Sequence, residues 1–157
     1  VSVTQINAGS GFNIIPQVTD FIGTIRTVNA DTRINVHKQF KDICEATALA
    51  YGCTADVSVV KGYPVTVNNI ESSEKAIQVT SSIFGSSSVK TNMAPSMGAE
   101  DFAYMLEKTP GAYIWLGAGE GKSGCMLHNT KYDFNDNILP LGIKYWEQLV
   151  KSELPLR

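Results

Sequence analysis

The sequence predicts a mixed fold: an α+β part up to about residue 61, followed by an α/β part. Apolar and polar residues alternate over residues 18–27, as in a half-buried strand, and apolar residues recur at helical spacing over residues 36–51. In the C-terminal half, a strand pattern at residues 112–116 precedes a glycine-rich loop and then a helix pattern. That order is typical of α/β units, which bind ligands at the carboxyl ends of their strands.

The composition is that of an ordinary soluble protein. The chain has 157 residues, of which 43% are hydrophobic and 18% charged, with a net charge of −2. We therefore expect no nucleic-acid partner, and no apolar run reaches the roughly 18 residues of a membrane helix. Three cysteines without paired spacing argue against a disulfide framework and favour a reducing, cytoplasmic compartment. The chain begins without Met inside a strand pattern, so we expect a fragment of a longer polypeptide.

The first 61 residues predict the order strand, strand, helix, strand. Residues 1–7 form the first strand, and residues 12–16 a short extended piece, because the residue before a proline is pushed toward β. In the alternating stretch, Phe21 and Ile25 share one face and Arg26 points to the other. We therefore expect a three-stranded antiparallel sheet with a helix on the face of Phe21 and Ile25.

That helix is predicted over residues 33–51, with its ends marked by local signals. Asp31 or Thr32 is the expected N-terminal cap, and Gly52 the expected stop. A third strand is expected at residues 55–61. Residues 62–69 then form a connector into the second half of the chain.

The second half predicts three helices, two short strands and one long loop. A helix capped by Asn68 and stopped by Gly85 comes first, followed by a strand at residues 89–92 and a helix that opens with Glu100 and Asp101. A strand at residues 113–116 leads into a loop over residues 117–136, in which Gly117, Gly119, Gly121 and Gly124 permit positive φ. The last helix is capped by Asn135 or Asp136. The loop carries His128, one of two histidines in the chain. By itself, a loop histidine is more often a surface residue than a metal ligand.

Six short motifs occur in a fixed order between residues 13 and 136. They are Asn13-Ile-Ile-Pro16, Gly23-Thr-Ile-Arg26-Thr27, Met97-Gly-Ala-Glu-Asp-Phe102, Pro110-Gly111, Trp115-Leu-Gly117 and Leu127-His128 followed by Tyr132-Asp-Phe-Asn-Asp136. Together they resemble the peptidase M20 superfamily, most closely its amidohydrolase branch of N-acyl amino acid, hippurate and auxin-conjugate hydrolases.

This resemblance implies a two-domain metallohydrolase. Its α/β catalytic domain holds two divalent metal ions (Zn, Mn or Co), and a ferredoxin-like lid domain forms a homodimer contact. Residues 1–66 would be part of the lid, and residues 67–157 the C-terminal part of the catalytic domain. A metal-activated water would attack the amide of an N-acyl amino acid. The family's general base and its other metal ligands precede the match, so we expect the chain alone to be inactive.

Three residues carry over from the family by position. His128 matches a metal ligand, and imidazole suits Zn, Mn or Co. Arg26 and Asn13 match substrate-binding lid residues. An arginine fork suits the substrate carboxylate, and Asn13 could donate to the scissile carbonyl oxygen. Otherwise Arg26 is a solvated strand residue, and Asn13 a turn residue.

Glu100, Asp101 and Gly117 are interpreted as adjacent to the site. Neighbouring residues on a helix do not face the same way. We therefore expect Glu100 and Asp101 to cap a helix or shape the metal loop, not to form a catalytic pair.

Two other functions compete with a metallohydrolase. One is a non-enzymatic α+β module that only dimerises or binds a small ligand, and metal dependence of the parent protein separates it from an enzyme. The other is a serine or cysteine hydrolase. No Gly-x-Ser-x-Gly motif is present to support the latter.

Overall fold

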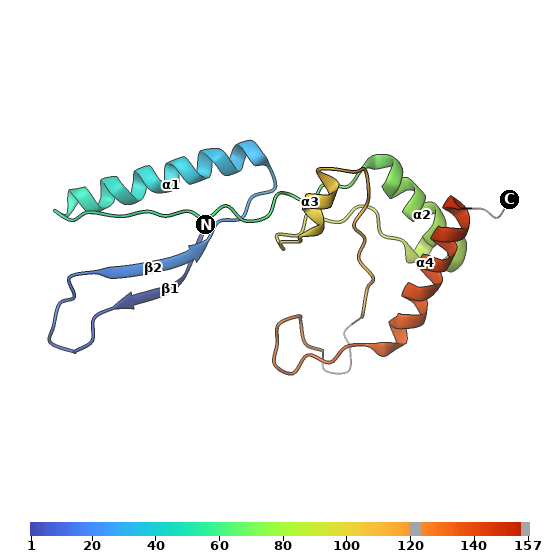
Figure 1. The fold of residues 1–157 in the computed structure, drawn as a ribbon. Coiled ribbons are helices and arrows are strands. Elements are labelled where there is room, and N and C mark those ends of the chain that lie inside the picture. Colours follow the sequence, from blue (N-terminus) through green and yellow to red (C-terminus); the bar gives the residue numbers. More distant parts are fainter. Residues whose placement is uncertain (120–123, 155–157) are drawn as a thin grey trace. The chain divides into compact units, whose positions relative to one another are not determined.

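The computed structural model describes residues 1–119 and 124–154 and has an α+β fold, as predicted (Figure 1). Its elements in order are β1 (Ser2–Ala8), β2 (Thr19–Thr24), α1 (Ala30–Ala50), α2 (Ile70–Phe84), the 3-10 turn η1 (Ser86–Ser88), α3 (Phe102–Leu106), the 3-10 turn η2 (Asp136–Ile138) and α4 (Leu139–Glu153). Part of the predicted glycine-rich loop, residues 120–123 with Gly121, lies outside the described residues.

The chain divides into two compact units. The first comprises Val1–Val65 with Pro95–Glu100, and the second Thr66–Ala94 with Asp101–Arg157. The segment 95–100 is thus part of the first unit although it is distant in sequence. Each unit is described by itself below.

The first unit contains an antiparallel hairpin of β1 and β2. Its register runs from Ser2 opposite Thr24 to Ala8 opposite Thr19, with one irregularity between Val3 and Gln5. At that irregularity the strands approach closely at Gly23. A Cβ atom on Gly23 would overlap the Ser2 carbonyl oxygen and lie 3.2 Å from the Val3 Cα. This position therefore requires glycine, which explains the first residue of the Gly23–Thr27 motif.

Replacing Gly23 with alanine is expected to lower the free energy of unfolding by about 1–3 kcal/mol, the usual cost of forcing extra atoms into a packed site. The clash is with backbone and cannot be relieved by rotating a side chain. Denaturant unfolding of the intact protein measures the loss. Gly62→Ala is the matched control, because a Cβ at Gly62 would meet no atom within 4 Å. Equal stability of the two variants would contradict this account of Gly23.

The loop that joins the two strands contains a tight turn. The backbone N–H of Ile14 donates to the Gly11 carbonyl oxygen at 3.3 Å, which leaves Phe12 and Asn13 at the tip. The predicted extended piece at residues 12–16 is therefore wrong at Phe12 and Asn13, which lie in the turn. The proline rule constrains only Ile15, whereas Gly9, with φ +72°, helps to reverse the chain.

Helix α1 begins three residues earlier than predicted. Its cap is Asn29, whose side-chain oxygen accepts from the N–H groups of Asp31 and Thr32 at 2.9 and 3.0 Å. Asn29 has the extended backbone of a cap, with φ −146° and ψ 136°, so Asp31 and Thr32 lie inside the helix. The predicted stop is confirmed, since Gly52 has φ +71° and Cys53 N–H donates to the Ala48 carbonyl oxygen.

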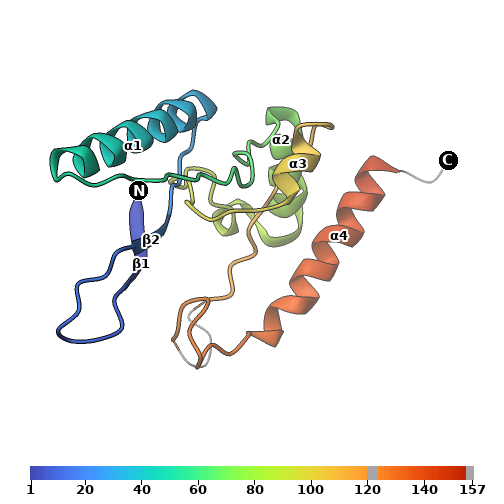
Figure 2. The same cartoon turned by 60° about the vertical axis from the view of Figure 1, so that its left-hand side comes forward.

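The predicted three-stranded sheet with α1 on one face is wrong. Residues 55–61 form no ladder in the described chain but run back along α1, as Figures 1 and 2 both show. Just after this segment, the Tyr63 carbonyl oxygen accepts a hydrogen bond from Nη1 of Arg33, in the first turn of α1, at 3.0 Å. Phe21, expected beneath the helix, is 65% exposed. Alternation predicts the faces of a strand, but a strand also needs a neighbour with a free edge.

The second unit is built on the packing of α2 against α4. Ala76 and Val79 from α2 meet Tyr145 from α4, with Ile83 and Leu149 at the margin. These residues recur at helical spacing along one face of each helix. Helix α2 is capped by Asn69, not Asn68, through its bond from Ser72 N–H at 3.0 Å, and the predicted stop at Gly85 is confirmed by its φ of +81°.

The strands predicted at residues 89–92 and 112–116 are absent from the described residues. Side chains hold the second segment instead. The Asn68 amide donates to the Tyr113 carbonyl oxygen at 2.9 Å and accepts from Tyr113 N–H at 2.8 Å, as a neighbouring strand would. Further along, a Cβ on Gly142 of α4 would lie 3.3 Å from Leu116 Cδ2. The segment is therefore anchored in the second unit without a ladder.

The chain leaves much of its surface uncovered. It exposes 13137 Å², whereas a folded protein of 17.0 kDa exposes about 7,700 Å², or about 9,300 Å² if divided into two equal globules. Many large apolar side chains contribute, among them Phe12 and Ile15 at 104% and 94% exposure. The chain therefore buries less of its surface than a compact folded protein of its mass.

Candidate functional site

The six residues that the sequence predicts at or near a site fall in both units. Asn13, Arg26 and Glu100 belong to the first, and Asp101, Gly117 and His128 to the second. The site is therefore built unit by unit.

Arg26 follows β2 and contacts the segment 95–100. Its Nη1 donates to the Met97 carbonyl oxygen at 2.6 Å, a short, charge-assisted hydrogen bond across 71 residues of sequence. The segment has its own bond, from Gly98 N–H to Ser96 Oγ at 3.2 Å. Two of the six motifs thus meet at one guanidinium. Arginine has five N–H donors, so most of the fork of this exposed side chain is left for a ligand.

Arg26 and Asn13 lie at opposite ends of the hairpin. Asn13 is in the loop before the Thr19 end of β2, and Arg26 follows the Thr24 end. Six residues of strand span about 17 Å at about 3.4 Å per residue. One small substrate molecule therefore does not reach both residues of the same chain.

His128 occupies a strained position in a tight turn. The N–H of Asn129 donates to the Met126 carbonyl oxygen at 3.2 Å, which makes His128 the third residue of a four-residue turn. Its φ of +70° makes it the one non-glycine residue with positive φ in the part of the chain that the structure describes. Glycine usually fills such a position, and strained residues persist where function requires them. The imidazole is exposed and free to take a ligand.

His128 fits a single position in a metal site. Zinc sites in proteins ordinarily use three or more nitrogen, sulfur or oxygen ligands. Across residues 1–119 and 124–154, no three His, Cys, Asp or Glu side chains gather as they would around a metal ion. Cys125, three residues before His128, is half-buried and belongs to no such group within these ranges. The described residues can thus contribute one metal ligand, not a complete site.

Asp101 does not cap α3 with its side chain, and Gly117 does not use its freedom to take positive φ. Asp101 is at the N-cap position of α3, but its carboxylate makes no capping bond, because the backbone there is already helical, with φ −73° and ψ −22°. Glu100 precedes it and is half-buried. Gly117 does not have the expected positive φ, unlike Gly119 and Gly124. Backbone conformation therefore does not explain why glycine occurs at position 117 of the motif.

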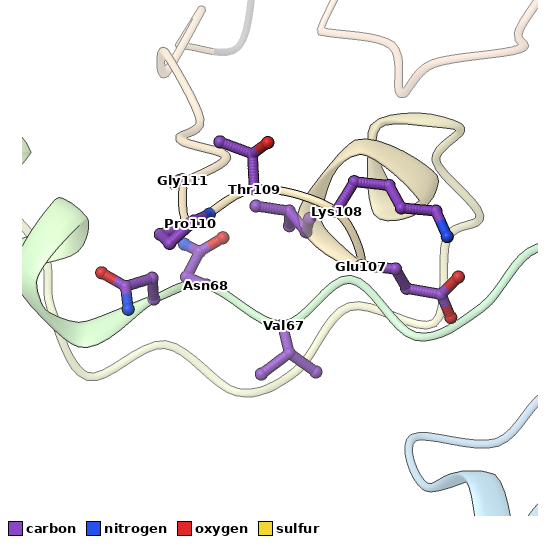
Figure 3. Close-up of a pocket in the computed structure, with 9 residues that line it drawn as sticks. Val67, Asn68, Glu107, Lys108, Thr109, Pro110 and Gly111 are labelled. Carbon is purple, nitrogen blue, oxygen red and sulfur yellow. The ribbon is translucent and has the colours of Figure 1, made fainter.

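An open pocket of about 420 Å³ lies in the second unit (Figure 3). It is lined by residues 67–69 before α2 and by residues 106–111 after α3. The polar group of Asn68 is already bonded to Tyr113. None of the six predicted site residues lines this pocket, so it does not form the predicted site.

Sequence reasoning missed the residues that anchor the site segments. Asn68, predicted to cap α2, bonds Tyr113 instead. Asn135, predicted with Asp136 as the alternative cap of the last helix, caps the turn η2 before that helix, and α4 itself has no side-chain cap. Asn135 also donates to the Ala118 carbonyl oxygen at 2.9 Å. The sequence did carry a signal: each asparagine stands beside a second residue that can cap a helix, Asn69 beside Asn68 and Asp136 beside Asn135. Since one cap is enough for a helix, the other residue could have been expected to bond elsewhere.

A profile of peptidase family M20/M25/M40 matches residues 4–152 of the chain. The chain belongs to this family. It is 36% identical over 145 residues to thermostable carboxypeptidase 2 of Saccharolobus solfataricus, covering 90% of this chain and 36% of that protein. It is 32% identical over 154 residues to the hippurate hydrolase of Campylobacter jejuni, covering 98% of this chain and 39% of that one.

A solved M20 structure has the same fold. The YXEP protein of Bacillus subtilis, described as a dinuclear metal-binding peptidase of the M20 family, matches with a TM-score of 0.78 and 25% identity, covering 99% of this chain and 42% of that chain. This M20 chain thus spans about two fifths of the length of its relatives. None of the helices within the described ranges has the length and apolar character needed to cross a membrane.

Proposed function

We propose that the protein carrying this chain is a metal-dependent amidohydrolase that cleaves the amide bond of N-acyl amino acids. The observation that carries the proposal is His128, an exposed imidazole held at φ +70° in a matched M20 sequence. Such strain is retained when the side chain must be presented in one direction. Relatives named hippurate hydrolase, N-acetyldiaminopimelate deacetylase and carboxypeptidase support the reaction class.

In this proposal His128 holds one of two divalent metal ions, Zn, Mn or Co. Imidazole nitrogen is a common ligand for each of them. A bound metal of this kind activates water and polarises a carbonyl group. The described residues contain no group of three ligating side chains, so in this proposal His128 acts with ligands and a general base from other parts of the protein.

Arg26 reads the carboxylate of the substrate's amino acid part. Its guanidinium is fixed at one corner by the Met97 carbonyl oxygen and is otherwise exposed. A fork held in this way loses little further freedom when a carboxylate binds bidentately. A free carboxylate beside the scissile amide is the feature that defines an N-acyl amino acid.

Asn13 serves the substrate site of a second copy of the chain in a homodimer. The length of the hairpin supports this assignment, because Asn13 and Arg26 are too far apart to share one substrate. At the tip, Asn13 is flanked by the exposed side chains of Phe12 and Ile14. An apolar tip of this kind suits insertion into a partner, where the Asn13 amide could donate to the carbonyl oxygen of the scissile bond.

Metal dependence of the intact protein tests the proposal. Treatment with a chelator is expected to abolish hydrolysis of an N-acyl amino acid, and adding back Zn, Mn or Co to restore it. A non-enzymatic binding module would show no hydrolysis under either condition. Turnover that survives complete removal of metal would also contradict the proposal.

A further inference from the structure

The side chain of Asn135 makes two hydrogen bonds with different parts of the second unit. Its Nδ2 donates to the Ala118 carbonyl oxygen at 2.9 Å, and its Oδ1 accepts from Asn137 N–H at 3.2 Å. The second bond caps η2, which leads into α4. The first bond ties residue 135 to a residue 17 positions earlier. The bond to Ala118 is partly buried, so losing that partner would leave a polar group poorly compensated by water.

Ala118 lies on an anchored segment. Two residues before it, the side chain of Leu116 packs closely on Gly142 of α4, where an added Cβ would lie 3.3 Å from Leu116 Cδ2. Further back, both the N–H and the carbonyl oxygen of Tyr113 are bonded to the Asn68 side-chain amide. The bond from Asn135 therefore connects the far end of the loop to a fixed part of the second unit. It does not merely join two loose pieces of chain.

Between His128 and Asn135 the chain is organised by consecutive turns. The turn that strains His128 closes at Asn129, whose carbonyl oxygen accepts from Tyr132 N–H at 3.0 Å and whose Oδ1 accepts from Lys131 N–H at 2.9 Å. A residue at φ +70° keeps that conformation only when its surroundings hold it. Residues 126–132 hold it locally. Downstream of this group, the hydrogen bond from Asn135 to Ala118 joins the chain to a distant part of the second unit.

We propose that Asn135 is a positioning residue for His128, which directs the imidazole by closing the Ala118 end of the loop onto the start of η2. The inference rests on the proposed function of His128 as a metal ligand. Asn135 itself touches neither metal nor substrate. Its separate donor and acceptor atoms allow the two bonds to be removed independently.

The test uses Asn135→Asp in the intact protein. An aspartate keeps the oxygen that caps η2 but has no N–H for the Ala118 carbonyl oxygen. Asn29→Asp is the matched control, because Asn29 caps α1 by accepting bonds alone. Two quantities are measured for each variant: the affinity for Zn²⁺ by calorimetry after the native metal is stripped, and the hydrogen exchange of the Asn129 and Tyr132 amides in the metal-free protein.

For Asn135→Asp we expect Zn²⁺ binding about tenfold weaker, at the lower end of the effect of groups that orient metal ligands. We also expect about tenfold faster hydrogen exchange at the Asn129 and Tyr132 amides, because the loop opens more often once the bond to Ala118 is lost. Asn29→Asp should change neither quantity. Unchanged exchange, or faster exchange with wild-type affinity, would overturn the positioning role.

His128→Ala separates the two claims. Wild-type Zn²⁺ affinity in this variant would refute His128 as a ligand, and the inference with it. If His128→Ala loses metal while Asn135→Asp binds Zn²⁺ like the wild type, the proposed function stands and the inference about Asn135 alone is wrong.

Discussion

Replacing His128 with alanine in the intact protein is expected to weaken metal binding by more than about a hundredfold and to abolish hydrolysis. Changes to groups that merely orient a ligand cost about 10–100-fold in metal affinity, and the loss of the ligand itself costs more. The expected cause is local, because the side chain is exposed and supports no core packing. Metal content by atomic spectroscopy and turnover of an N-acyl amino acid measure the two effects. A variant with full metal content and activity would remove His128 from the site.

A glycine at the same position separates chemistry from folding. His128 has φ +70°, where an L-residue is penalised by about 1–2 kcal/mol and glycine is not. In metal-free protein, His128→Gly should therefore be more stable to denaturant than His128→Ala by about 1 kcal/mol, yet equally unable to bind metal. A residue that is both strained in the fold and required by the function would give this pattern. If glycine were less stable than alanine, the strained turn would not describe this position.

The parts of the fold that could be predicted are those fixed by neighbours in sequence. Gly52 and Gly85 end their helices as expected, because a helix stop depends on one residue that tolerates positive φ. The first cap was misplaced from Asn29 to Asp31 or Thr32, since all three residue types can cap and only backbone geometry selects one.

The strands could not be predicted in the same way. Residues 55–61 and 112–116 have strand patterns, but a ladder needs a partner, and none of the described residues supplies one. Their surroundings are a helix in the first case and the Asn68 amide in the second. The alternating pattern indicates which side chains are suited to burial, but it does not indicate which part of the protein covers them.

For the site, motifs located residues but not their connections. Gly23–Thr27 and Met97–Phe102 were found separately, and the bond from Arg26 to the Met97 carbonyl oxygen links them. Likewise, Asn135 is predicted as a cap of the last helix, and its bond to Ala118 depends on how the 16 residues between them fold back. Contacts of this kind arise from tertiary packing, which no local pattern encodes.

Replacing Arg26 with alanine is expected to raise KM for N-acyl amino acids by about 10- to 150-fold, which corresponds to the roughly 1.5–3 kcal/mol of a hydrogen bond to a charged group. Amides of the same substrates, which lack the free carboxylate, should lose much less. Steady-state kinetics with both substrate types measures the difference. It also controls for disturbance of the segment 95–100, because a loosened Met97 would impair both substrates alike.

Arg26→Lys supplies a sharper comparison. Lysine keeps the positive charge but is a point donor without a planar fork, so it cannot bond the Met97 carbonyl oxygen and hold a carboxylate bidentately as arginine can. We therefore expect KM for N-acyl amino acids to fall between the wild-type and alanine values. A lysine variant equal to the wild type would show that charge alone is read at this position, and equal losses for the acid and its amide in both variants would show that Arg26 does not read the carboxylate.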